Sequence, residues 1–430
     1  MLALVAALAL LVQQPDTTFR PVAPPEARAD TIVVDDEPAE VVEEVAEDID
    51  RARLRPVFSP SALYSPSKGF GVGGGFAVDG VLSPGDHMQV EARLAQNLQG
   101  GFAEYLTDEP GNDKWAGVLG VAAWTTTRTA FRGHGPHSAV GGDLWLDRMA
   151  AEAEARLAWA PAGPRGVLVQ PTLRGRFDRV RGFEERTAGA RALVQPGDRT
   201  RLEALAGTDR YGVELAVSAL RDTRDLRAMP SHGAYVEGEV GRFQALDGSG
   251  LGVWRAQAMG LAFRPTLFRV PFLPERGALF VRANGVVTRQ DRGEPLPWIY
   301  LPELDRDLLV GYPRSDFAGR DALSLGVGAR GVIGEALGAF LVEGTAMAMV
   351  GAAYDDVFSE FTPRVRFSSD RSGVGERVPL SPSLAVGLNL HYLERERPLV
   401  GALVGVGPGG VSFASLRLVW GLGDYRPRLR

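Results

Sequence analysis

The chain lacks several features that would define a common class of protein. It has no cysteine, which excludes disulfides, thiolate zinc sites and thiol nucleophiles. No internal run approaches the roughly 20 apolar residues that a membrane-spanning helix requires. The net charge of −6 gives no basic stripe, so we expect no nucleic-acid partner. No third ligand joins His134 and His137 at metal-site spacing, so neither a metal nor a cofactor is expected.

Composition divides the chain into three parts. Residues 1–14 form an apolar segment that resembles the core of a signal peptide. Residues 15–56 are rich in proline and acidic residues and predict a linker with one short helix near residues 39–54. Glutamates near the start of that helix and arginines near its end suit the helix dipole. Residues 57–430 form one large domain with a different pattern.

Alternation of apolar and polar residues dominates this large domain. Between residues 151 and 159, Ala153, Ala155 and Leu157 share one face, while charged residues occupy the other. The 53 glycines exceed the roughly 7% average usage, and many lie inside such alternating runs. Both features favour a transmembrane antiparallel β-barrel, an all-β fold with lipid outside and water inside. Sixteen strands fit the length best, and fourteen or twelve are also compatible with it.

The charged residues on the expected inner face carry both signs. They could line a hydrated pore, or they could neutralise one another in a filled interior. Because a single buried charge is costly, we expect pairing between adjacent strands. These residues are Glu91, Arg93, Glu152, Glu154, Arg156, Arg174, Arg176, Glu237 and Glu239.

A long segment at residues 297–320 interrupts the strand pattern. It is rich in proline and aromatic residues and lies between two glycine-spaced runs. Hairpin connections usually have two to five residues, so a connection of this length is expected to be functional.

Three sequence anchors, in order, resemble the bacterial surface-antigen family. The first is residues 64–73, similar to a Tyr-x-Pro-x-x-Gly-x-Gly opening strand. The second is a strand-start motif, and the third is the long segment itself. The family is the barrel part of a superfamily that includes the outer-membrane protein insertase and two-partner secretion transporters. The residues of the strand-start motif are Asp222, Arg224, Asp225, Pro230 and Gly233.

The resemblance implies a particular role for the long segment. In the family it folds into the barrel, where an arginine of an Arg-Gly-aromatic triplet pairs with an acid on the wall. Here Val310 takes the arginine position and Met349 the acidic one, so we expect docking by apolar contact. Replacing both partners of a buried ion pair with packed apolar groups is often neutral. The residues expected to form this lock or gate are Val310, Gly311, Tyr312, Phe317, Gly319, Arg320 and Met349.

Two departures from the family pattern affect the functional expectation. A literal Arg-Gly-Phe triplet occurs at residues 181–183, but its flanks do not match, and we interpret it as a strand end and turn. The soluble transport-associated domains of the family do not fit in residues 1–56, whose second part we interpret as a periplasmic linker. Insertase activity is therefore less strongly implied than the barrel itself.

The resemblance implies an outer-membrane barrel of a Gram-negative-type bacterium, surrounded by lipid, and allows for a separate periplasmic protein as partner. We expect a role in membrane transport or outer-membrane protein assembly rather than an enzyme. The alternatives are a passive pore or structural barrel without insertase activity and, less favoured, an outer-membrane enzyme. An enzyme would need a serine, a histidine and a carboxylate converging on one wall near the rim.

Overall fold

The computed structural model describes most of the large domain. It covers residues 57–419 apart from 66–68, 80, 82–85, 109–113, 132–143, 162–165, 186–205, 226–229, 266–276, 293–295, 298–299, 302–308, 310–318, 337–339, 368–376, 393–397 and 409. The predictions for the signal-like segment and the linker lie outside these residues.

Within the described residues the domain is almost entirely strand. The strands are β1 (Val57–Ser65), β2 (Gly69–Asp79), β3 (His87–Ala95), β4 (Leu98–Asp108), β5 (Trp115–Phe131), β6 (Leu144–Trp159), β7 (Leu168–Glu185), β8 (Asp209–Asp222), β9 (Gly233–Ala245), β10 (Gly252–Pro265), β11 (Ala278–Arg292), β12 (Asp321–Ala336), β13 (Phe340–Tyr354), β14 (Phe361–Val365), β15 (Val378–Tyr392), β16 (Pro398–Gly407) and β17 (Gly410–Val419). A helix of four residues, α5 (Val357–Glu360), precedes β14. No helix in the described part of the chain is long and apolar enough to cross a membrane.

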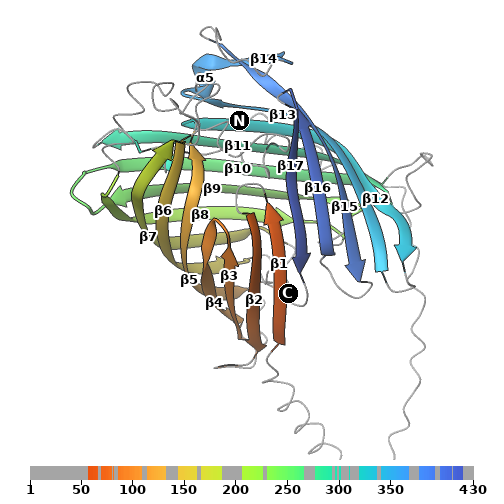
Figure 1. Cartoon of the computed structure of the whole chain (residues 1–430), viewed down its shortest axis with the longest axis horizontal. Helices are drawn as coiled ribbons and strands as arrows, with labels where there is room; N and C mark the ends of the chain where they lie inside the picture. Colours follow the sequence, from red (N-terminus) through yellow and green to blue (C-terminus); the bar gives the residue numbers. More distant parts are fainter. Residues whose placement is uncertain are drawn as a thin grey trace, which may run out of the picture.

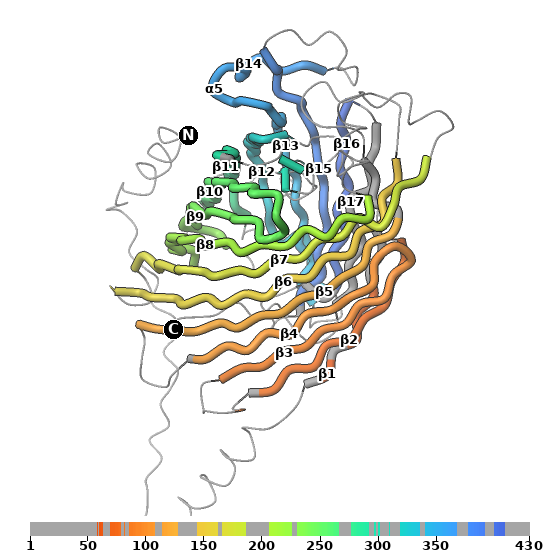
Figure 2. Tube along the Cα trace, turned by 90° about the vertical axis from the view of Figure 1, so that its left-hand side faces the viewer, coloured from red at the N-terminus to blue at the C-terminus, as the bar shows by residue number. Residues whose placement is uncertain are grey.

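The described strands form one sheet of 17, in which the short β14 pairs in parallel with β15. The other sixteen pair in antiparallel fashion with their neighbours, which confirms the predicted barrel fold and strand number. Figures 1 and 2 show β1 to β8 following one another in sequence order along one side of the molecule. β1 and β17, the first and last strands, pair with each other over four positions within the described residues.

The two ends of the barrel differ in what they carry. An even number of antiparallel strands brings the start of β1 and the end of β17 to one end, called here the terminal end. The opposite end, called the loop end, carries the connection from β11 to β12, which spans residues 293–320. We call this segment the β11–β12 connection.

The outer face of the barrel is apolar. Leu119, Leu215 and Val240 are each more than half exposed and point away from the interior. Every second residue of a strand turns outward, so alternation presents these side chains to lipid, where they stabilise the barrel. At the terminal end of the barrel, the ring of Trp115, which begins β5, stacks 5.6 Å from the ring of Trp159, which ends β6. Tryptophan at this position is typical of a membrane interface.

Candidate functional site

The first described stretch of the β11–β12 connection packs inside the barrel near the loop end. Leu296, Tyr300 and Leu301 are all buried. The Tyr300 ring lies 4.9 Å from the ring of Phe243 on β9. Burial, followed by the nearby Asp178 carboxylate, raises the pKa of the Tyr300 phenol, so this side chain stays neutral. The apolar cluster around these residues, the Tyr300 cluster, also contains Leu144, Leu146, Val180, Phe243, Ala245, Leu251 and Val253.

A hydrogen bond from the barrel wall fixes the same stretch. Nη2 of Arg255, on β10, donates to the backbone carbonyl of Tyr300 at 2.5 Å. A bond from an ionised donor is stronger than one between neutral groups. Here the arginine belongs to the wall and the acceptor to the connection, the reverse of the arrangement that the family resemblance implies. No motif in the sequence marked Arg255 for this role.

A second contact places the connection on a different part of the wall. Leu309 is fully buried and packs with Met349 and with alanines of β12, β13 and β15. The wall at Met349 is therefore apolar and is covered by the residue that precedes Val310. The contact predicted between Val310 and Met349 stays a prediction, because part of the lock lies outside the described residues. The undescribed members are Val310, Gly311, Tyr312 and Phe317.

The connection returns to the sheet through a close approach of two backbones. A Cβ atom on Gly319 would lie 2.6 Å from the carbonyl oxygen of Tyr354, so a glycine is required beside the end of β13. Arg320, the next residue, is exposed. At the loop end, Gly319 is therefore closely packed against β13, whereas Arg320 is exposed.

Asp321, the first residue of β12, fastens this return point. Its buried carboxylate accepts hydrogen bonds from the backbone N–H groups of Thr288 (3.1 Å) and Val357 (2.9 Å). It also accepts bonds from Nη1 (2.6 Å) and Nη2 (3.0 Å) of Arg289. One carboxylate thus links β11, β12 and the start of α5. Asp321 directly follows Arg320, a residue of the predicted lock, yet nothing in the sequence distinguished Asp321.

Further toward the terminal end lies a layer of paired charges on three adjacent strands, called here the charge layer. Arg174 of β7 contacts Glu152 (3.1 Å) and Glu154 (2.8 Å) of β6. Arg174 and Arg176 also reach Glu214 of β8, at 3.2 and 2.9 Å. The side chains meet because the registers of β6, β7 and β8 place them opposite or diagonal to each other. Three carboxylates thus meet two guanidinium groups, and Arg156, which pairs with Glu154, supplies the third positive charge that balances them.

The remaining predicted inner-face charges have more local partners. Glu91 pairs with Arg93, and Arg156 pairs with Glu154, each within one strand. Glu237 accepts a hydrogen bond from the hydroxyl of Tyr235, also along one strand. Glu239 accepts one across strands from Nε2 of Gln257 at 3.2 Å. Pairing between adjacent strands thus describes the charge layer and Glu239, but not the other three contacts.

His391, on β15, belongs to a polar cluster on the inner wall of the barrel. His391 is buried, and its Nε2 lies 3.0 Å from Oε2 of Glu343. The same carboxylate accepts a bond from Nδ2 of Asn389 at 3.1 Å and pairs with Arg330. This cluster links β12, β13 and β15 near the terminal end. The alternation of β15 alone could not reveal it, because Glu343 reaches His391 only through the register between strands.

The triplet at residues 181–183 lies near the end of β7, which continues to Glu185, so the predicted strand end is confirmed, whereas the triplet itself is still strand and not turn. Val180 and Phe183 contribute to the Tyr300 cluster. The arginine of the triplet, Arg181, reaches the sulfur of Met149 at 3.6 Å. Val180 and Phe183 therefore help to hold the β11–β12 connection by apolar packing in the Tyr300 cluster.

The strand-start motif builds the connection from β8 to β9 at the terminal end. Nε and Nη2 of Arg224 bind the carboxylate of Asp222 at 2.8 and 2.7 Å. Asp225 accepts bonds from the backbone N–H groups of Ser231 (3.0 Å) and His232 (3.2 Å). Pro230 is buried in the same turn. These contacts shape a turn, which indicates a structural role for the motif.

Gly233 completes the motif and permits a direct test of that role. Its φ of +96° is rarely adopted by other residues, and a Cβ atom would lie 2.2 Å from the carbonyl oxygen of Thr223. Gly233→Ala should therefore destabilise the barrel by about 1–3 kcal/mol, measured by urea unfolding. Gly238→Ala on the same strand, where the nearest atom is 3.9 Å away, is the control. Equal effects of the two substitutions would show that the conformation of Gly233 is not limiting.

The contacts described above could either hold the barrel interior open or obstruct it. The geometry of this site combines the described stretch of the β11–β12 connection in the interior, an apolar cluster around that stretch and a balanced charge layer further in. Among the described residues, no three histidine, aspartate or glutamate side chains converge as a metal site requires.

Comparison with solved structures identifies the fold. BamA from Haemophilus ducreyi lacking POTRA domains 1-3 matches with a TM-score of 0.59 and 10% identity, over 86% of this chain and 71% of its own. CdiB from Escherichia coli matches with a TM-score of 0.54 and 10% identity, over 86% of this chain and 63% of its own. The chain thus spans less than two thirds of the CdiB structure. No family model and no curated protein matches the sequence. The fold is that of an outer-membrane β-barrel.

Proposed function

We propose that this barrel, which shares its fold with BamA and CdiB, acts in transport across the outer membrane or in assembly of proteins into it. In this proposal the β11–β12 connection is an internal strut that restricts the passage. The observation that carries the proposal is the double anchoring of the connection. One anchor is the Tyr300 cluster with Arg255, and the other is Leu309 on the wall at Met349.

The two anchors lie on separate parts of the wall. The Tyr300 cluster uses β6, β7, β9 and β10, whereas Leu309 contacts β12, β13 and β15. Buried contacts with both groups of strands support a connection that enters the interior instead of remaining above the rim. Long connections positioned by a rigid scaffold are often functional. The apolar Tyr300 cluster would also oppose the passage of ions, because it offers no groups to replace their hydration.

Deletion of residues 304–320 tests the strut directly. In planar lipid bilayers the intact barrel should open rarely, and the deletion should produce large, lasting openings because the Leu309 anchor is lost. A second variant replaces residues 304–320 with a glycine–serine linker of the same length, which keeps the span and removes the anchor. Removal of residues 187–203, an equal length of the β7–β8 connection, is the control. Unchanged conductance in both variants would contradict the strut.

The alternative is a passive or structural barrel without assembly activity, and one observation favours it. Met349 is apolar and buried, and Val310 stands where the family lock has its arginine, so an activity tied to that charge pair would be absent. An assembly assay separates the two. The protein in proteoliposomes would be given a urea-unfolded outer-membrane barrel, and folded, protease-resistant product would be measured. A rate equal to that of protein-free liposomes would favour the alternative.

A further inference from the structure

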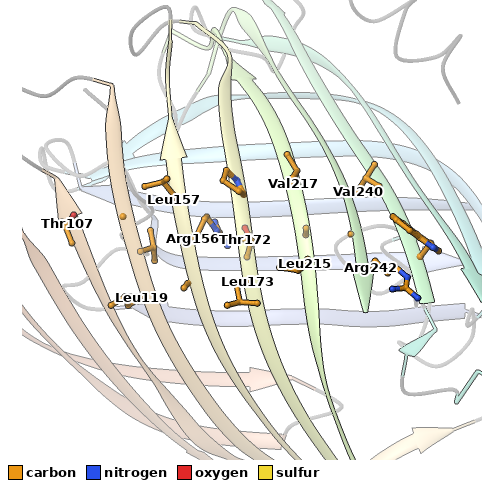
Figure 3. A pocket seen from close by; sticks show the side chains of 17 residues that line it. Thr107, Leu119, Arg156, Leu157, Thr172, Leu173, Leu215, Val217, Val240 and Arg242 are labelled. Atoms are coloured by element: carbon orange, nitrogen blue, oxygen red, sulfur yellow. The ribbon is translucent and has the colours of Figure 1, made fainter. Parts of the chain in front are cut away.

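A groove crosses the outer, lipid-facing side of strands β4 to β10. Its volume is about 830 Å³. Figure 3 shows Leu119, Leu157, Leu173 and Leu215 on successive strands along it. These leucines belong to the exposed apolar belt, since each is between 46% and 64% exposed. The groove therefore opens to membrane hydrocarbon rather than to the interior.

Short side chains create the hollow. Gly117, Ala155 and Pro171 line it between the leucines and valines of the belt. Pro171 also affects the backbone, because proline has no N–H to donate to a neighbouring strand. The β6–β7 register passes from Arg156–Thr172 to Trp159–Val169, with no pair at the two positions between. The sheet thus departs from regular pairing beside the groove, where packing by another molecule would support it.

The end of the groove nearest the loop end carries a cation and an indole. The guanidinium of Arg242 lies 5.6 Å from the ring centre of Trp254, directly across the β9–β10 register. Nη2 of Arg242 donates to Asp291 at 3.0 Å and to Gln244 at 3.3 Å. A guanidinium has five N–H donors, and both of these bonds are made by Nη2.

This pair of side chains places one end of the groove at headgroup level. Tryptophan is enriched at membrane interfaces, and arginine on a lipid face is tolerated best there. From Arg242 the groove continues over Leu215 and Leu173, which the membrane core would surround. A ligand that fits must therefore join an anionic group to a long apolar chain.

We propose that this groove binds a phosphate-bearing membrane lipid, with one acyl chain along the leucine-lined floor and the phosphate at Arg242. The apolar lining suits a hydrocarbon chain, because few polar groups could orient a soluble ligand. A guanidinium suits a phosphate, since its planar N–H groups can bind two phosphate oxygens at once. The cation at one end gives the lipid a single orientation. Such a lipid would fill the hollow beside Pro171 and support the sheet there.

Trp254 lines the groove and provides a reporter for the test. The purified barrel in detergent micelles would be titrated with phosphatidylglycerol that carries brominated acyl chains, which quench tryptophan fluorescence on contact. The signal of Trp254 is the difference between the intact chain and Trp254→Phe. We expect this quenching to saturate at low lipid. Brominated diacylglycerol, which lacks the phosphate, should need at least ten times more lipid for half-saturation, as should phosphatidylglycerol with Arg242→Gln.

Filling the groove provides a steric test with a matched control. Ala155→Phe should abolish the saturable quenching, whereas Ala153→Phe, exposed on the same strand and face but outside the groove lining, should preserve it. Heat-dependent migration on gels would establish that both variants fold. Quenching that rises linearly with lipid content, or that responds equally to both substitutions, would mean ordinary annular lipid and would overturn the proposal. Equal binding of diacylglycerol and phosphatidylglycerol would also overturn it.

Discussion

Replacement of Arg174 by methionine should lower the free energy of unfolding by about 3–5 kcal/mol, the range for removing one partner of a buried ion pair. Arg174 contacts Glu152, Glu154 and Glu214 together. Without it, Arg176 and Arg156 would face these three carboxylates, and Glu214, which is only 3% exposed, would lose one of its two guanidinium partners. Urea titration followed by tryptophan fluorescence, with gel mobility as a second measure of folding, would give the change.

Arg179→Met on the same strand is the matched control for this prediction. Arg179 pairs with Asp209, but the side chains are 43% and 38% exposed. Solvent screens such a pair, so its loss should matter little. If Arg174→Met lowers the free energy of unfolding no more than Arg179→Met does, the charge layer is hydrated. That result would favour an open pore over a filled interior.

Arg255→Met should increase the fraction of time that the barrel conducts by roughly tenfold to a hundredfold. A hydrogen bond to a charged group contributes about 1.5–3 kcal/mol, and each 1.4 kcal/mol is a factor of about ten in an equilibrium. Loss of the bond from Arg255 to the Tyr300 carbonyl removes that amount from the first anchor of the strut. Single-channel recording of open and closed times would measure the shift, and Arg255→Lys should show a smaller one because a donor remains.

Gln257→Met tests whether any lumen change on β10 has this effect. Gln257 lies two residues along the same inner face as Arg255, but its amide bonds to Glu239 rather than to the β11–β12 connection. Its replacement should leave the open fraction near that of the intact barrel. An equal increase in both variants would show that Arg255 acts through the general lining of the interior and not through Tyr300.

The sequence predicted what depends on a single strand. Alternation assigned Glu152 and Glu154 to the inner face and Leu157 to the outer one, because a strand turns successive side chains to opposite sides. The same reasoning gave the all-β fold and the sixteen spanning strands. It also identified the β11–β12 connection as unusual, since its length and composition differ from those of a hairpin.

Features that depend on contacts between strands could not be predicted from the alternation within one strand. Glu214 and Arg255 are single charges whose partners lie 40 and 45 residues away, so their roles follow from strand register and loop docking. The contact between His391 and Glu343 likewise depends on the register between β13 and β15. The apolar docking surface was anticipated at Met349, but the described residue that covers it is Leu309 rather than Val310.

The four-position pairing of β1 with β17 has a consequence for the order of folding. Ser61 meets Val419 there, so the contact joins nearly the two ends of the domain and requires the largest loop closure of any pairing in the described sheet. Every other antiparallel pair joins strands that are close in the sequence and can form early. The β1–β17 pair can form only after the intervening strands have assembled into a curved sheet. In the described part of the junction, few hydrogen bonds then compensate for the entropy lost in this late step. Amide protons at this junction should therefore exchange with solvent sooner than those of β6 and β7, where pairing is longer and more local.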